Sequence, residues 1–176
     1  MSTKPVTVST QGDRVDGVIA AWRRERPDID VSSIAVLTRA LLIGRHLQKA
    51  RDRALRELGT DTPTLEVLAT LRRSGAPYRL RTSEIEAATS VTAGAISQRL
   101  DRLETRGFVQ RKRDDVDKRV IHVSLTKKGR RLIDGVVAGL MTREEQLLEP
   151  LDERDRKTLE RLLTRWLRWF EEEGTA

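Results

Sequence analysis

The chain has 176 residues, with 34 Lys and Arg against 27 Asp and Glu, so its formal net charge is +7. It has no cysteine, and no HExxH, GxSxG, GxGxxG or GxxxxGK pattern occurs, which excludes disulfides, cysteine-ligated zinc, thiolate catalysis and the common nucleotide-binding loops. No apolar run is long enough for a signal peptide or a membrane span, so we expect a cytoplasmic protein that is not membrane-bound. Because no catalytic or metal-binding residue pattern occurs, we expect that it is not an enzyme and holds no metal or cofactor.

The first third of the chain is predicted to consist of a tail and two helices. Residues 1–12 are rich in Ser and Thr and are expected to form a flexible tail. Apolar spacing predicts a short helix over 13–26 and a long helix that ends at about Leu58, with Asp30 or Ser32 as its N-cap. The long helix carries two apolar stripes, which implies burial on two sides, as between its own domain and a partner subunit.

Further helix and strand signals follow in the middle of the chain. Thr62 and Pro63 have the order of an N-cap and a first helical residue, so a helix is expected to begin there. Residues 78–80 are long enough only for an edge strand. Ser83 and Glu86 have the spacing of a capping box, which predicts a short helix at this point.

A helix over Thr92–Arg106 and two strands are predicted next. Residues 108–113 and 120–125 alternate apolar and polar side chains, as half-buried strands do, and a charged turn joins them. Two longer helices follow, the first of them capped by Thr126. The order is that of a helix-turn-helix followed by a two-stranded wing, so the predicted fold class is mainly α with a small β-wing.

The positive charge is concentrated in this part of the chain. Residues 78–131 contain 14 Lys and Arg against 7 Asp and Glu, whereas the remaining residues contain 20 of each kind. A basic segment inside an otherwise neutral chain indicates a polyanionic partner, with nucleic acid as the first candidate and an anionic membrane as the second. No aromatic-rich amphipathic face accompanies the charges, which weighs against the membrane.

The predicted helix that ends at Arg106 has an apolar stripe and an opposite polar face. The stripe, which must face the core, consists of Ile96, Leu100 and Leu103. Gln98 lies on the opposite side, with Ser97 and Arg102 on its flanks, and such side chains can bond base edges in the major groove. The N-terminus of the helix at Thr92 favours a phosphate oxygen. We therefore predict that these four polar residues contact DNA; the alternative is that they are merely solvated.

The wing supplies a second set of candidate DNA contacts. Arg113 precedes the turn, and Lys118 and Arg119 follow it. The turn also contains three aspartates, which would repel phosphate, so some of them must be paired internally. Asp117 is expected to brace Arg119 for a narrow minor groove, where the potential is most negative. The alternative is a disordered charged loop.

The segment from Thr92 to Gly129 resembles the MarR family of bacterial winged-helix regulators. It has the family's Leu-Glu-x-x-Gly pattern at the end of the recognition helix, Asp-x-Arg in the wing and Leu-Thr-x-x-Gly from Leu125 to Gly129. The resemblance implies a homodimer on a pseudo-palindromic double-stranded operator, with recognition helices in successive major grooves. It divides the chain into a tail at 1–12, N-terminal helices for dimerisation and a ligand pocket at 13–60, the winged helix-turn-helix domain at 61–125 and C-terminal dimerisation helices at 126–173.

An added N-terminal helix with Trp22 resembles the urate-responsive PecS/UrtR-type subgroup of that family. In that subgroup a ligand pocket is formed by four positions, which here fall on Trp22, Glu66, Arg99 and Arg111. Arg99 is expected to be partly buried because of its place on the recognition helix, so it needs an acidic partner or an anionic ligand. Glu66 replaces an aspartate of the subgroup and could pair with either arginine.

The function predicted from the sequence is therefore a dimeric transcriptional regulator, most often a repressor in this family. A small anionic ligand, either a purine metabolite or an organic acid, is expected to release it from DNA. We expect it to be cytoplasmic and associated with the nucleoid. The alternative is a nonspecific architectural winged-helix protein that coats DNA and has no ligand switch.

Overall fold

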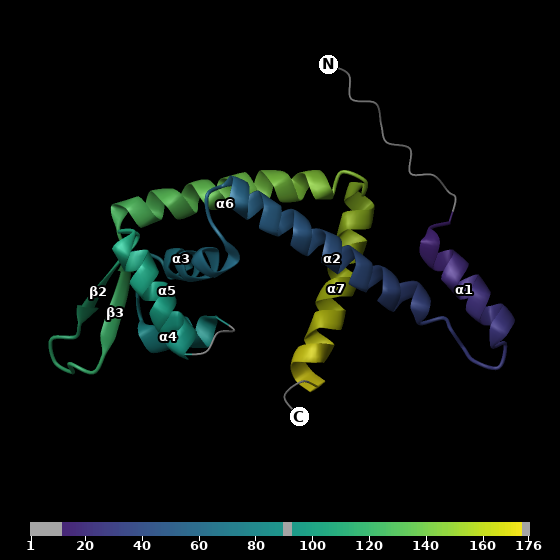
Figure 1. The fold of residues 1–176 in the computed structure, drawn as a ribbon, viewed down its shortest axis with the longest axis horizontal. Coiled ribbons are helices and arrows are strands. Elements are labelled where there is room, and N and C mark those ends of the chain that lie inside the picture. Colours follow the sequence, from purple (N-terminus) through teal and green to yellow (C-terminus); the bar gives the residue numbers. More distant parts are fainter. Residues whose placement is uncertain (1–11, 90–92, 174–176) are drawn as a thin grey trace, which may run out of the picture. The chain divides into compact units, whose positions relative to one another are not determined.

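The computed structural model describes residues 12–89 and 93–173, and the chain forms two compact units (Figure 1). Within those residues the first unit comprises 12–46 with 143–173, and the second comprises 47–142. The unit boundaries fall inside two long helices, α2 (Ile34–Glu57) and α6 (Lys127–Leu147), each of which contributes to both units. The predicted tail lies outside the described residues, apart from Gly12.

In the first unit, α1 (Arg14–Glu25) packs against the start of α2. Val15, Ile19 and Val31 are buried there against partly buried side chains of α2. Arg39 of α2 also binds the carboxylates at the start of α1, at 2.8 Å from Asp13 and 2.7 Å from Asp16. These ion pairs lower the pKa of Asp13 and raise the pKa of Arg39. α1 and the start of α2 are thus joined by an apolar contact and by a forked arginine.

Much of the apolar surface of this unit is exposed. α7 (Glu153–Glu173) has no buried residue, although Leu, Trp and Phe side chains recur along one of its faces. The same holds for one stripe of α2, where Val36 and Ile43 are among the exposed residues. The sequence predicted burial of α2 on two sides. In this chain Ile34, Ala35 and Leu42 are partly buried against α1, and Ala54 and Leu55 are buried in the core of the second unit, whereas Val36 and Ile43 stay exposed. Apolar helix faces of this extent are typical of interfaces between subunits.

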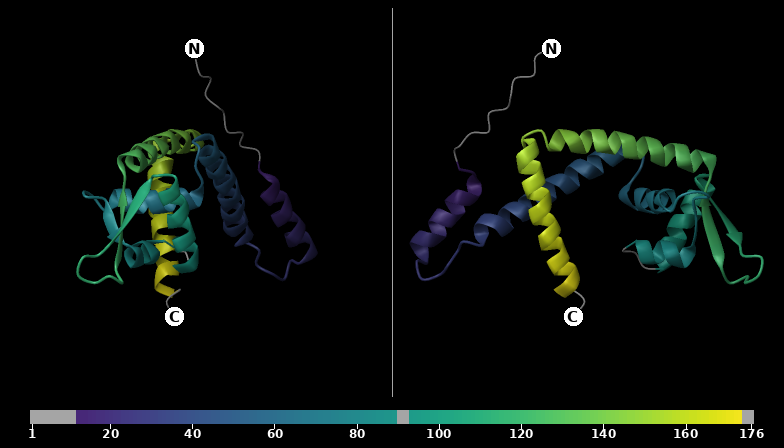
Figure 2. Two further views of the ribbon diagram at one scale, coloured as in Figure 1. Left: turned by 60° about the vertical axis from the view of Figure 1, so that its left-hand side comes forward. Right: turned by 180° about the vertical axis from the view of Figure 1, so that it is seen from behind.

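In the second unit a small sheet lies beside several helices, and its β2–β3 hairpin projects away from them, as the views in Figure 2 show. Besides parts of α2 and α6, its elements are α3 (Thr62–Arg73), β1 (Arg79–Arg81), α4 (Thr82–Ala88), α5 (Ala93–Thr105), β2 (Val109–Arg113) and β3 (Ile121–Leu125). The three strands are antiparallel in the order β1-β3-β2, so β1 is the edge strand that the sequence predicted. The helix-turn-helix and the wing are therefore present as expected.

One apolar core holds the second unit together. The predicted stripe of α5 is buried in it: Ile96, Leu100 and Leu103 are each at most 2% exposed. They lie in one cluster with apolar residues of α3, α4, β3 and α6. Burial of this stripe fixes which side of α5 faces solvent, because a helix presents opposite faces to core and water.

Two helix starts differ from the sequence prediction. α3 is capped by Asp61, whose carboxylate accepts a hydrogen bond from the amide of Thr64 at 2.8 Å, so Thr62 is already helical. α4 follows β1 without a loop, and the carboxylate of Glu84 accepts a hydrogen bond from the amide of Arg81 at 2.6 Å. The predicted capping box of Ser83 and Glu86 is therefore wrong, because the helix begins at Thr82 rather than after Ser83.

Candidate nucleic-acid interface

The exposed face of α5 carries three of the residues predicted to contact DNA. Ser97, Gln98 and Arg102 are exposed, and the buried stripe of the same helix lies on the other side. The structure thus brings them onto one solvent-facing surface. Thr92 lies outside the described residues. These side chains are donors and acceptors of the kind that reads base edges in the major groove, and their contact with DNA stays a prediction.

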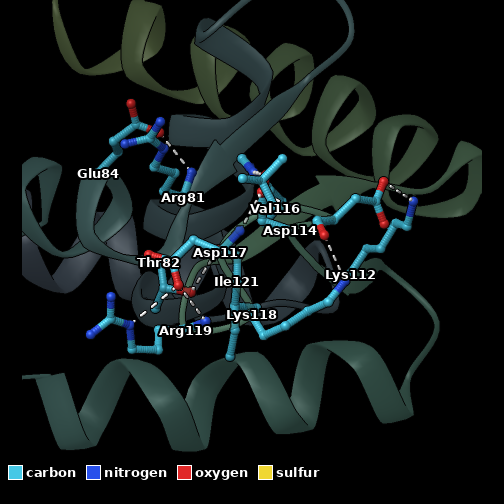
Figure 3. A network of polar contacts seen from close by, with 12 residues as sticks. Arg81, Thr82, Glu84, Lys112, Asp114, Val116, Asp117, Lys118, Arg119 and Ile121 are labelled. Carbon is cyan, nitrogen blue, oxygen red and sulfur yellow. Dashed lines mark hydrogen bonds and ion pairs between the residues drawn. The ribbon is translucent and has the colours of Figure 1, made fainter.

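The turn of the wing is organised by the carboxylate of Asp114, as Figure 3 shows. Its Oδ1 accepts hydrogen bonds from the amides of Val116 at 2.9 Å and Asp117 at 3.1 Å. Its Oδ2 lies 2.9 Å from Nε2 of His122 on β3. These hydrogen bonds stabilise the charged carboxylate and lower the pKa of Asp114 to about 2. The turn therefore has a defined conformation rather than that of an unstructured charged loop.

The other two aspartates of the turn are also paired within the wing. Asp115 lies 3.1 Å from Nζ of Lys112. Asp117 accepts hydrogen bonds from both the amide of Arg119, at 3.0 Å, and its Nε, at 3.3 Å. The predicted bracing of Arg119 is confirmed, and the arginine side chain remains 92% exposed. All three carboxylates thus have cationic or amide partners, which reduces the repulsion of phosphate that the sequence alone suggested.

The remaining wing candidates are exposed cations. Arg113 ends β2, and Lys118 donates a hydrogen bond from Nζ to the carbonyl of Asp115 at 2.9 Å. With Arg119 they lie at or beside the turn, where a wing can reach a DNA backbone or a minor groove. The structure therefore gathers all three predicted wing residues at one end of the sheet.

Two of the four predicted ligand residues are in contact. NH1 of Arg99 lies 3.5 Å from Oε2 of Glu66, and the arginine side chain is 25% exposed. The expectation that this arginine is partly buried and has an acidic partner is confirmed. Trp22 lies on α1 in the first unit, where 48% of it is exposed.

Of the two arginines that the sequence offered as partners of Glu66, Arg111 is not the one that pairs with it. Its amide and Nε donate to the carboxylate of Glu104 at 2.9 and 2.8 Å, and its NH2 donates to Asp101 at 2.6 Å. The pairing lowers the pKa of Glu104 and raises the pKa of Arg111. Arg111 thus connects the last turns of α5 to β2. Sequence reasoning missed this connection, although the Leu-Glu-x-x-Gly pattern contains Glu104.

A cavity of about 320 Å³ lies in the second unit beside Glu66. Polar side chains and an apolar wall from α6 line it, and the polar ones are Arg51, Glu66, Thr70, Arg73 and Thr89. Neither Arg99 nor Arg111 is part of the lining, but Arg99 forms an ion pair with Glu66, which does line the cavity. The cavity therefore has the mixed polar and apolar lining that small-molecule sites commonly show.

Over residues 12–89 and 93–173, no group of three or more His, Cys, Asp or Glu side chains is arranged to hold a metal ion. No helix in the same ranges is both long and apolar enough to cross a lipid bilayer.

Known proteins share both the sequence and the fold of this chain. The sequence profile of the MarR family matches residues 58–120. The HTH-type transcriptional regulator PecS of Dickeya dadantii (strain 3937) is 33% identical over 151 residues, which make up 86% of this chain and 91% of PecS. The matched region is thus much longer than the second unit, which contains the wing and is called the winged unit from here on.

Solved structures agree with these sequence matches. A mutant of MarR from E. coli is 27% identical, with a TM-score of 0.62, over 73% of this chain and 95% of that protein. The same mutant solved in complex with operator DNA is 24% identical, with a TM-score of 0.63, over 79% of this chain and 99% of that protein. At this identity the match shows that the two proteins have a similar fold. The match to PecS along most of both chains, together with the family profile over the winged unit, shows that this chain belongs to the MarR family of winged helix-turn-helix transcriptional regulators.

Proposed function

We propose that the protein binds a pseudo-palindromic operator as a homodimer and represses transcription until a small anionic ligand releases it. The observation that carries the DNA-binding part is the wing, where Asp117 holds an almost fully exposed Arg119 and every turn aspartate has an internal partner. An arginine held in this way loses less conformational entropy on entering a minor groove. The function places the protein in the cytoplasm, on the nucleoid.

The exposed apolar faces of α2 and α7 support the homodimer. A second copy would cover them and would convert one winged unit into two related by a two-fold axis. Such symmetry calls for two half-sites about one helical turn apart, so the operator is expected to be a pseudo-palindrome. In each half-site Ser97, Gln98 and Arg102 of α5 would face the major groove, and Thr92, which precedes α5 in the sequence, is the fourth residue proposed to contact DNA.

The ion pair between Arg99 and Glu66 supports the ligand response. It joins α5 to α3 beside the cavity, so an anion that takes Arg99 from Glu66 would favour a different position of the recognition helix. The four residues assigned to the ligand site are Trp22, Glu66, Arg99 and Arg111. The first arginine to test is Arg99, because Arg111 already has two carboxylate partners.

DNA binding is tested by fluorescence anisotropy with palindromic and random duplexes at increasing salt. A dimer that neutralises about 6–10 phosphates should give a plot of log K against log salt with a slope of roughly −5 to −9. Gln98→Ala should relax base preference and leave this slope unchanged, since it contacts no phosphate. Equal affinity for palindromic and random duplexes would instead support the nonspecific architectural protein.

The ligand response is tested by adding purine metabolites and small organic acids to the protein–DNA complex. Arg99→Ala should abolish the effect of the ligand on DNA binding, whereas exposed Arg102→Ala should weaken DNA binding and keep the response. Tryptophan fluorescence follows ligand binding directly. If Arg99→Ala is released as readily as the unmodified protein, the proposed site is wrong.

A further inference from the structure

The excess positive charge of residues 78–131 does not lie at the wing turn or on the reading face of α5. All seven acidic residues of this window fall within 81–104 and 109–123, together with eight of its 14 Lys and Arg. The part that holds α4, α5 and the wing therefore has a net charge of only +1. The other six cations have no acidic residue among them in the sequence, and they account for nearly the whole surplus.

These six residues lie around the other end of the sheet, where β1 begins, β3 ends and α6 starts. We call them the base patch: Arg79, Arg106, Lys127, Lys128, Arg130 and Arg131. The amides of Leu125 and Thr126, at the end of β3, donate to the carbonyls of Tyr78 and Phe108 at 3.1 and 3.0 Å. The same strand ends thus bring together the segments that carry the patch. All six side chains are exposed.

Two aromatic rings fix part of the base patch. Arg106 and Lys128 lie over the ring of Phe108, at 4.8 and 5.0 Å from its centroid. Arg130 lies 5.6 Å from the centroid of Tyr78, and Arg72 of α3 lies 4.8 Å from the same ring. Cations that stack on rings keep their charge accessible while their side chains are restrained. The patch is thus a partly ordered array of positive charge.

The placement of these cations is unfavourable for the isolated fold. Four of them lie in the first turns of α6, which has no acidic residue in its first turn. Positive charges at this end of a helix oppose the helix dipole and also repel one another. Features that oppose local stability in this way are common at functional surfaces.

The base patch lies at the opposite end of the sheet from the wing turn. In the strand register Val109 pairs with Leu125 at the base, and Arg113 pairs with Ile121 next to the turn. Five residues of extended strand separate the two ends by about 17 Å, and Figure 1 shows α6 beginning at the end of β2 and β3 opposite the turn. That the turn faces the operator is taken from the proposed function, on which this inference rests.

We infer that the base patch binds the phosphate backbone of a second DNA segment while the recognition helix and wing hold the first. No large apolar side chain is exposed among residues 72–79, 105–108 and 124–135. A protein partner would normally need an apolar or aromatic centre in its interface. A phosphate backbone needs only accessible lysine and arginine. The charges and the missing apolar centre therefore favour DNA over an acidic protein.

The test is a two-duplex capture experiment on the full-length protein. A biotinylated duplex is immobilised and loaded with protein, and a fluorescent duplex of random sequence is then added at roughly 50 to 200 mM salt. Lys127→Gln/Arg131→Gln removes two charges of the base patch that do not stack on either ring. Arg14→Gln/Arg23→Gln, on exposed positions of α1, removes the same charge elsewhere.

Both double variants should bind the immobilised duplex as the unmodified protein does. The base-patch variant should capture several-fold less second duplex, with a salt slope for that step smaller by about 2. It should unfold at the same temperature or slightly higher, because the cations oppose the dipole of α6. Equal capture by the two variants overturns the inference, as does tighter capture of fluorescent polyglutamate than of the duplex at the same salt concentration.

The same experiment separates this inference from the proposed function. Arg113→Gln/Arg119→Gln should lose binding to the immobilised duplex. If it binds that duplex as well as the unmodified protein does, the proposed DNA-binding face is wrong, whatever the base-patch variant shows. A protein that captures neither duplex overturns both proposals.

Discussion

The two ends of the small sheet differ in how their charges are balanced. At the turn, Asp114, Asp115 and Asp117 bind the cations and amides around them, and Arg119 projects from the pairing into solvent. At the base, three of the six patch cations, Arg106, Lys128 and Arg130, lie over the rings of Phe108 and Tyr78. One end thus directs a single arginine, and the other presents uncompensated charge.

This difference shows that the net charge of a DNA-binding domain indicates its affinity for phosphate and not its sequence specificity. Contacts to phosphate give affinity and position, whereas contacts to bases and groove shape give specificity. A turn that is close to neutral gains little from long-range attraction, so its effect depends on the direction of Arg119. A base patch of net positive charge attracts any polyanion and carries no sequence information.

The largest expected effect is a loss of stability when the packing at the base of the sheet is disrupted. Gly129 packs so closely on the backbone of Phe108 that a Cβ would lie 2.0 Å from its carbonyl oxygen. Gly129→Ala must therefore displace backbone, and we expect it to lower the free energy of unfolding by about 3 kcal/mol. Urea unfolding measures the loss. Gly135→Ala in the same helix has nothing within 4 Å of its Cβ and should stabilise the protein slightly; equal effects would contradict the packing argument.

The next effect concerns the ion pairs that join α5 to its neighbours. Arg111, which is 27% exposed, bonds two carboxylates, so Arg111→Ala should lower the free energy of unfolding by about 1–3 kcal/mol. Arg99→Ala breaks one pair at 3.5 Å and should cost less. Double-mutant cycles with Glu104 and Glu66 measure the two couplings. A weaker coupling for Arg111 than for Arg99 would show that the connection to β2 does not position the recognition helix.

The elements could be predicted from the sequence because their signals are local. The stripe of Ile96, Leu100 and Leu103 has helical spacing, and its burial follows from that spacing alone. The link between Asp117 and Arg119 was also predictable, since the two residues are neighbours in a turn. Cap positions were less certain: Asp61 and Arg81 precede the expected starts because the adjoining strand and loop decide where a helix begins.

The partners of long-range charges could not be predicted in the same way. Arg111 had several acidic residues within reach, and only the packing of β2 on the end of α5 selects Glu104 and Asp101 over Glu66. The charge count showed a basic window but not its division between two ends of a sheet. That division depends on strand register, which pairs Arg79 with Ser124 and so carries the start of β1 to the base.

A smaller effect is expected from the protonation of Asp114. Its pKa is lowered from an ordinary value near 3.9 to about 2, so the folded state favours the carboxylate. This contribution to stability is complete above the unfolded pKa and is lost as pH falls from about 4 through 2. Asp114→Asn should therefore be less stable than the unmodified protein at neutral pH, and the difference should shrink over that range. A difference independent of pH would mean that the charge of Asp114 is not what orders the turn.

The smallest expected effect shows whether DNA binding depends on how Arg119 is oriented or only on the positive charge of the turn. Asp117→Ala releases Arg119, and as a surface change it should alter the free energy of unfolding by no more than about 0.5 kcal/mol. Without the brace the arginine must be ordered on binding, so preference for sites with a narrow, A-tract minor groove should fall. Asp115→Ala removes the same charge but releases Lys112 instead. It should strengthen binding to every duplex and leave the preference unchanged, because a carboxylate is lost while Arg119 keeps its direction; anisotropy titrations with A-tract and mixed flanks distinguish the two.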